Sequence, residues 1–206
     1  MQFFPRRTER PMYDLFGDLA ELLVQAADTH SKLVGHGYRE RTRIAPKLHD
    51  QSTRAEELGR RIAQRLARSL ITPYEAELLY DISLTIADTV DAMNHTAELL
   101  VLSRVGALPA PLLEAATGIE RASELTVTAT WSLSRVQELA DYYTQIRKLK
   151  RQGDRLVRQS LAEVYKRGGA MTEVLPLHDV IESVGRTIAL QEHTARLADL
   201  LRVKDA

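Results

Sequence analysis

The segment from Pro73 to Val101 carries the strongest pattern in the sequence and limits what the chain can fold into. Thr72 can cap a helix here, Pro73 suits its first position, and Glu75 can reach back to the cap. All charges of this segment are negative, so it needs a basic neighbour or a cation beside it. Its apolar residues recur in steps of three and four, as on one buried helix face: Leu78, Leu79, Ile82, Ile86, Val90, Met93, Ala97 and Leu100.

The same periodicity predicts five further helices and no strand. They cover about residues 12–34, 39–69, 112–133, 134–166 and 172–203. Pro176 leaves open whether the last helix begins at Thr172 or at Leu175. The stretch 103–111 holds one Gly and two Pro, and we predict that it links two halves of the chain.

A repeat joins these halves. His95-Thr96-Ala97 recurs as His193-Thr194-Ala195, at an offset of 98 residues, and the predicted helix lengths match at that offset. Short turns between long helices make sequence neighbours antiparallel. We therefore predict an all-α fold of six long helices that form two pseudo-repeated three-helix bundles, residues 1–105 and 106–206.

Composition excludes several classes of protein. With no cysteine, the chain has no disulfide, thiolate metal site or Cys nucleophile. No apolar run approaches the roughly 20 residues that span a bilayer, and the N-terminus does not read as a secretory signal. A net charge of zero argues against a nucleic-acid binder, so we expect no nucleic-acid partner.

Catalytic motifs are absent from the sequence. It contains no Gly-rich phosphate loop, no GxSxG and no HExxH, and its Ser, His and Asp residues have no spacing that suggests a triad. We therefore expect a protein that is not an enzyme.

Two long segments resemble a known family. "LITPYEAELLYDISLTIADTVDAMNHTAELLVL" looks like the central segment of the PhoU-like proteins that accompany Pit-type inorganic phosphate transporters. "IRKLKRQGDRLVRQSLAEVY", the later "VLPLHDVIESVGRT" and the closing Val203-Lys204 are similar to their last two helices. The resemblance also covers the opening Met12-Tyr13-Asp14-Leu15-Phe16 and so nearly the whole chain. It implies a pair of three-helix bundles and a cytoplasmic accessory role in phosphate uptake.

Some members of this family hold metal ions on Glu/Asp-x-x-x-Asp motifs, one on each of four helices, and carboxylate oxygens are ligands that hard cations or iron accept. Here the resemblance leaves Glu56, Asp88, Asp91 and Asp154 as candidate metal ligands. The motif is eroded at five positions: Ser52, Ala87, Lys150, Gly185 and Ala189. We therefore expect a lost or reduced metal site, with no cofactor beyond a divalent or iron ion.

Four features have alternative interpretations. Asp81, Asp88, Asp91 and His95 share one helix stripe, which reads as a cation patch or as a solvated acidic face. His193 repeats His95, and both read as residues at a helix interface. Lys150 and Asp154 read equally as a local ion pair or as plain surface residues, and Trp131 reads as a core or interface residue more than as a ligand-stacking one.

The helices at 39–69 and 134–166 are rich in Arg and Lys. Their basic stripes could bind phosphate, acidic lipid headgroups or nucleic acid, but the interleaved acids favour ordinary ion-paired helices. The acidic helix at 73–101 can lie beside the basic one that precedes it.

These observations favour a non-catalytic accessory or regulatory protein of inorganic phosphate transport. Such a protein would lie at the inner face of the cell membrane and dock on a Pit-type phosphate transporter. A metal-binding helical protein that uses the remaining acids is the alternative. Homo-oligomer formation, the identity of the permease and the direction of regulation stay open.

Overall fold

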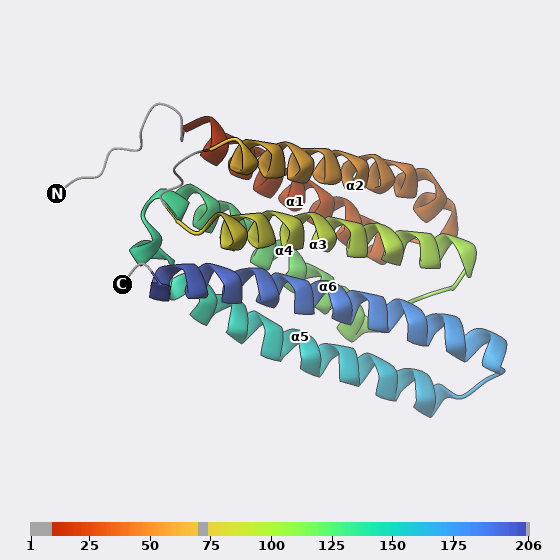
Figure 1. The fold of residues 1–206 in the computed structure, drawn as a ribbon. Coiled ribbons are helices and arrows are strands. Elements are labelled where there is room, and N and C mark those ends of the chain that lie inside the picture. The colour runs from red at the N-terminus through yellow and green to blue at the C-terminus, as the bar shows by residue number, and fades with distance from the viewer. Residues whose placement is uncertain (1–9, 70–73, 205–206) are drawn as a thin grey trace.

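A computed structural model describes residues 10–69 and 74–204, and all regular structure within these ranges is helical. Six long helices confirm the predicted all-α fold (Figure 1). They are α1 (Arg10–Gly35), α2 (Tyr38–Ala67), α3 (Ala76–Leu102), α4 (Ala110–Trp131), α5 (Ala140–Arg167) and α6 (Met171–Lys204), with short 3₁₀ helices η1 (Ser132–Ser134) and η2 (Val136–Leu139) before α5.

The six helices pack as two trios that share one core. Helix α2 packs on α1 and α3, and α5 packs on α4 and α6. Extensive contacts of α1 with α4 and of α3 with α6 join the trios, which leaves α2 and α5 at opposite edges (Figure 1). Because buried residues of all six helices form one continuous cluster, the two trios are not separate cores. The domain boundary at residues 105 and 106 falls between α3 and α4 and stays a prediction.

Helix bounds agree with the repeat. Shifting α2, residues 38–67, by 98 positions gives 136–165, and α5 covers 140–167. The same shift takes α3, residues 76–102, to 174–200, within α6 at 171–204. The predicted correspondence of helices therefore holds in order and in length.

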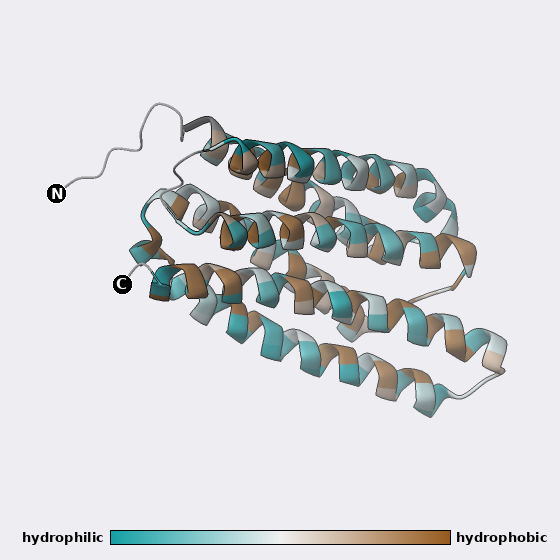
Figure 2. Cartoon of the chain, viewed as in Figure 1, coloured by the Kyte–Doolittle hydropathy of each residue, from teal (hydrophilic) through white to brown (hydrophobic). Residues whose placement is uncertain are grey.

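Helix α3 lies in the interior of the arrangement, against α1, α2 and α6. All eight residues of its predicted apolar stripe are buried. Figure 2 shows hydrophobic and hydrophilic residues recurring in turn along the helices. Buried threonines also line this helix, and their hydroxyls donate to backbone carbonyls four residues earlier, as from Thr89 to Thr85 at 2.7 Å. These bonds satisfy hydroxyl groups that burial would otherwise penalise.

The predicted start of this helix is wrong. Helix α3 begins at Ala76 with Glu75 as its N-cap residue, and no side chain caps it. The backbone of Glu75 is extended, with ψ at 117°, so the helix does not continue back past Ala76. Thr72 and Pro73 themselves, like the N-terminal residues 1–9, lie outside the described residues.

Two other helix starts differ from the sequence analysis. Helix α5 begins at Ala140 instead of residue 134, because η1 and η2 turn the chain and bury Leu133, Val136 and Leu139. Helix α6 begins at Met171, ahead of both predicted positions, and Pro176 lies inside it. Proline removes one N–H donor there, which the first turns of a helix tolerate better than its middle.

Arg41 is a buried cation near the start of α2, with 1% of its surface exposed. Its Nη1 donates to the carbonyls of Val105 at 2.6 Å and Gly106 at 3.1 Å, and its Nε to that of Leu33 at 3.3 Å. Burial lowers the pKa of this guanidinium. One side chain thus joins the end of α1, the start of α2 and the connection between the two trios.

His30 of α1 is completely buried, and neither ring nitrogen has a hydrogen-bond partner among the described residues. Burial lowers the pKa of His30 to about 4, because the interior penalises the charged form. The imidazole is therefore neutral in the folded protein under ordinary conditions.

We predict that replacing Arg41 with Met lowers the free energy of unfolding by about 3 kcal/mol, because three carbonyls, two of them in buried hydrogen bonds, lose a charged donor. Urea denaturation measures this loss. The matched control is Arg39→Met, an exposed arginine two residues earlier in α2, which should change the free energy by less than about 0.5 kcal/mol. Equal effects of the two substitutions would contradict the role given to Arg41.

A second prediction concerns acid stability. His30 has a folded pKa of about 4, below its ordinary value of 6.5, so the unfolded chain binds more protons between these values. His30 therefore makes the protein less stable as pH falls from about 6.5 to 4, by roughly 3 kcal/mol in total. His30→Leu should remove this loss, measured as the difference in unfolding free energy at pH 7 and pH 4.5. An unchanged difference would contradict it.

Candidate functional site

A hollow of about 300 Å³ between α2 and α3 contains three of the four predicted metal ligands. Glu56 comes from α2, and Asp88 and Asp91 come from α3. Seven further residues line the hollow: Gly59, Arg60, Ala63, Tyr80, Ser83, Leu84 and Ala87. The sequence pattern therefore identified carboxylates that the fold brings onto one surface.

Helix geometry explains this gathering. Ser52 and Glu56 are four residues apart and share one face of α2, while Asp88 and Asp91 share one face of α3. The two helices are antiparallel neighbours, and Ser52 Oγ donates to Asp91 Oδ1 at 3.1 Å. Ser52 thus stands where the family motif would carry an acid, and its hydroxyl forms a hydrogen bond with the remaining acid, Asp91.

Burial and a neighbouring like charge both act on the carboxyl group of Asp88 in the hollow. Partial burial raises the pKa of Asp88, and repulsion from Asp91 raises it further. Arg186 of α6 acts in the opposite direction and lowers it. This arginine was not among the predicted site residues, although its charge beside the eroded position Gly185 is visible in the sequence.

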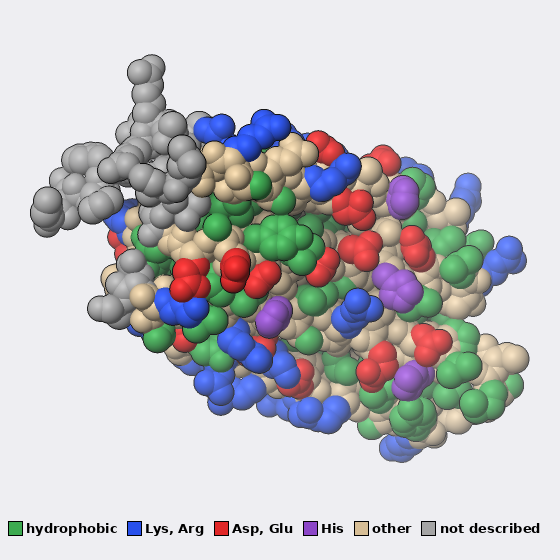
Figure 3. Space-filling view, viewed as in Figure 1, with side chains coloured by type: hydrophobic (Ala, Val, Ile, Leu, Met, Phe, Trp, Pro, Cys, Tyr) green, Lys and Arg blue, Asp and Glu red, His purple; other side chains and the backbone are tan. Residues whose placement is uncertain are grey.

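Helix α3 does lie beside the arginine-rich α2, as predicted. However, Arg60 at the edge of the hollow pairs with Glu57 of its own helix, at 2.8 Å. In Figure 3, acidic side chains gather over α3, and Lys and Arg side chains lie mainly over α2 and α5 on either side. The acidic stripe is therefore an exposed surface, and Arg60 does not pair with it.

Asp154, the fourth predicted ligand, lies apart from the other three on α5. Its Oδ2 accepts from Lys150 Nζ at 2.6 Å, which confirms the predicted local ion pair. Next to this pair α5 approaches α6 closely, since a Cβ on Gly153 would lie 2.8 Å from Ile188 Cδ1. Apolar packing therefore occupies the space between α5 and α6 at the level of the eroded motifs.

Within residues 10–69 and 74–204, no three carboxylate or imidazole groups lie close enough together to hold a metal ion. The charges around the acids give a physical reason. Asp154 is already paired with the side chain of Lys150, and the positive charge of Arg186 acts on Asp88. The residues present do not fit a multi-metal cluster.

Two other expectations for single residues are wrong. His95 and His193 are exposed and do not lie within a helix interface, and His95 Nδ1 lies 4.0 Å from Glu98 Oε2. Trp131 was expected in the core or at an interface; 53% of its surface is exposed, and the remainder lies at the interface of α4 with α1. One edge of its ring covers Gly17 of α1, where an added Cβ would lie 2.9 Å from the ring carbons.

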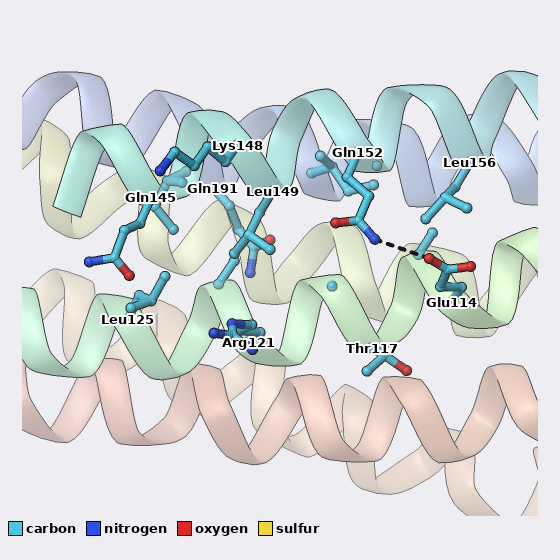
Figure 4. A pocket seen from close by; sticks show the side chains of 16 residues that line it. Glu114, Thr117, Arg121, Leu125, Gln145, Lys148, Leu149, Gln152, Leu156 and Gln191 are labelled. Atoms are coloured by element: carbon cyan, nitrogen blue, oxygen red, sulfur yellow. Dashed lines mark hydrogen bonds between the residues drawn. The ribbon is translucent and has the colours of Figure 1, made fainter. Parts of the chain in front are cut away.

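A larger hollow of about 580 Å³ lies between α4 and α5. Figure 4 shows side chains from both helices pointing into it, with Gln152 of α5 hydrogen-bonded to Glu114 of α4 at 3.0 Å. Gln191 of α6 also lines the hollow, but its Nε2 already donates to Ile119 O and Ser123 Oγ of α4. The hydrogen bonds of Gln152 and Gln191 in this hollow therefore serve mainly to join the helices.

No family model matches the chain. Solved structures match it closely in shape. A PhoU-like protein from Shewanella oneidensis MR-1 aligns with a TM-score of 0.74 at 17% identity, over 97% of this chain and all of that one. PhoU from Pseudomonas aeruginosa aligns with a TM-score of 0.71 at 14% identity, over 97% of this chain and 98% of that one. The chain has the PhoU-like fold.

A similarity in sequence accompanies this likeness in shape. A Rhizobium meliloti (strain 1021) protein named "Putative pit accessory protein" is 22% identical over 166 residues, which are 79% of this chain and 77% of that protein. Among the helices that the structure describes, none is long and apolar enough to span a bilayer.

Proposed function

We propose that this PhoU-like protein is a non-catalytic accessory or regulatory protein of inorganic phosphate transport, which docks on a Pit-type permease at the cytoplasmic face of the membrane. The observation that carries the proposal is the agreement of two comparisons. The fold matches PhoU over nearly the whole chain, and a distant relative carries the name of a pit accessory protein.

The acidic stripe on α3 supports docking on a membrane protein. Asp81, Asp88, Asp91 and Glu98 are exposed on this helix, and Glu56 of α2 borders them. Cytoplasmic loops of membrane proteins carry an excess of Lys and Arg. A permease therefore presents positive charge on the side where this negative surface would approach, and complementary charge speeds and orients association.

We predict that deleting this protein changes phosphate uptake in its host. Re-expression of the native chain should restore uptake, whereas Asp81→Asn/Asp91→Asn should restore less and recover less permease on co-purification, because two docking charges are lost. Radiolabelled phosphate uptake is the measurement. Asp14→Asn/Glu163→Gln, which removes two exposed acids elsewhere, is the matched control and should behave as the native chain does. Unchanged uptake after deletion, without any permease recovered, would refute the proposal.

A second candidate function is metal binding, favoured by the meeting of Glu56, Asp88 and Asp91 at one hollow. Carboxylates there would take a hard divalent cation or iron. Elemental analysis of protein purified without chelator tests this alternative. We expect less than stoichiometric metal in a fully folded protein, because Arg186 and Ser52 already compensate the acids. Stoichiometric metal that disappears in Asp91→Asn would favour the alternative instead.

A further inference from the structure

Helix α5 has an outer face that no other helix covers. Its main contacts are with α4, α6 and the short η2, and the side chains of its outer face are exposed at one edge of the molecule. Five cations lie on this face within about 100° of one another around the helix axis. They are Arg147, Lys148, Arg151, Arg155 and Arg158, all of them exposed.

These five cations are not neutralised by neighbouring acids. Helix α5 is described in full, and none of the five forms an ion pair with a carboxylate of the described residues. Asp154, the only acid between Tyr142 and Ala162, is bound to Lys150. Arg147 stacks over the ring of Tyr143 at 5.5 Å, which leaves its charge uncompensated. Figure 3 shows this gathering of Lys and Arg along the α5 edge.

The repeat provides an internal comparison, because α2 is the helix that corresponds to α5. On α2, Arg43 pairs with Glu40 at 2.7 Å and Arg60 pairs with Glu57 at 2.8 Å. Arg54 and Arg61 share a hollow with acids of α1 and α2, namely Asp18, Glu21 and Glu57. Two α2 arginines thus form ion pairs and two more lie beside acids, as the sequence analysis favoured for both helices, whereas none of the five α5 cations pairs with a carboxylate of the described residues.

Exposed apolar side chains follow the cations at the end of the same helix. Tyr165 comes seven residues after Arg158, two turns along the same face, and is 57% exposed. Across the Gly168-Gly169 turn, Met171 and Leu175 of α6 are 71% and 51% exposed. The ring of His178 lies 6.4 Å from that of Tyr165, so both sides of the turn contribute to one cluster. Figure 3 shows hydrophobic side chains at this end of the molecule.

We propose that the cationic face of α5, together with the apolar residues Tyr165, Met171 and Leu175 at its end, binds the surface of an acidic phospholipid bilayer. Lys and Arg near such a surface attract anionic headgroups, while Tyr, Met and Leu enter the boundary between headgroups and acyl chains. A nucleic acid would use the charges but not the adjoining apolar cluster, so the combination favours lipid.

The inference goes beyond the proposed function because it requires no permease. A chain that does not bind lipid could still dock on a permease and alter phosphate uptake. A chain that does not alter phosphate uptake could likewise still bind lipid, so either proposal can be refuted while the other stands.

Flotation of the full chain with vesicles tests the proposal. We expect binding to vesicles of phosphatidylcholine mixed with phosphatidylglycerol, and little binding to phosphatidylcholine alone. Arg151→Gln/Arg155→Gln should weaken binding roughly 30-fold. Arg54→Gln/Arg61→Gln removes the same charge from the opposite edge and should bind as the native chain does. Circular dichroism of each variant checks that it is folded.

A third variant separates the apolar contribution. Met171→Gln/Leu175→Gln keeps every charge and should weaken vesicle binding about tenfold, because two exposed side chains no longer leave water. Equal binding to neutral and acidic vesicles, or equal losses in the α5 and α2 variants, would overturn the proposal. Tighter binding to duplex DNA or RNA than to acidic vesicles would overturn it as well.

Discussion

The contact of Arg41 with three backbone carbonyls holds the end of α1 and the start of α2 against the segment that connects the two trios. Helices α1 and α3 run in the same direction, so their carboxyl ends lie together at one end of the molecule (Figure 1). Leu33 belongs to the last turn of α1, and Val105 and Gly106 follow the end of α3. Helix ends of this polarity attract positive charge, so a buried guanidinium is favourable there without a carboxylate partner. The segment that leads into the second trio is fixed by the same side chain.

Both candidate surfaces follow from the arrangement of the two trios. Because α1 joins α4 and α3 joins α6, the edge helices α2 and α5 have no neighbour on their outer sides. Helix α3 is buried on three sides, and its remaining face must carry all its charges, which are negative. The hollow with Glu56, Asp88 and Asp91 is therefore a consequence of placing an acidic helix beside α2. The cationic edge on α5 arises because α5 lacks the acids that lie beside the arginines of α2, its repeat mate.

Periodicity was sufficient to predict the six helices, because an apolar residue in every turn specifies which face is buried. The apolar stripe of α3 is the clearest case. The family resemblance, and not the spacing alone, named Glu56, Asp88 and Asp91, which the structure places at one hollow between α2 and α3. Tertiary contacts were not predictable in this way. Arg41 looked like any other arginine of a solvated helix, and nothing local marks it as the residue that meets three carbonyls. His30 and Trp131 show the same limit, because a residue's type states a preference for burial but not the neighbours it will have.

A net charge of zero hides how strongly charge is separated in this protein. The acids of α3 and the cations of α5 cancel in the total, yet each set lies on its own exposed surface (Figure 3). Ionic screening at physiological salt acts over about 8 Å, so a partner that touches one surface responds to that charge and hardly to the total. Overall neutrality therefore argues less strongly against a charged partner than composition alone suggests. The two surfaces suit opposite partners, one basic and one acidic, and a membrane that contains a permease offers both.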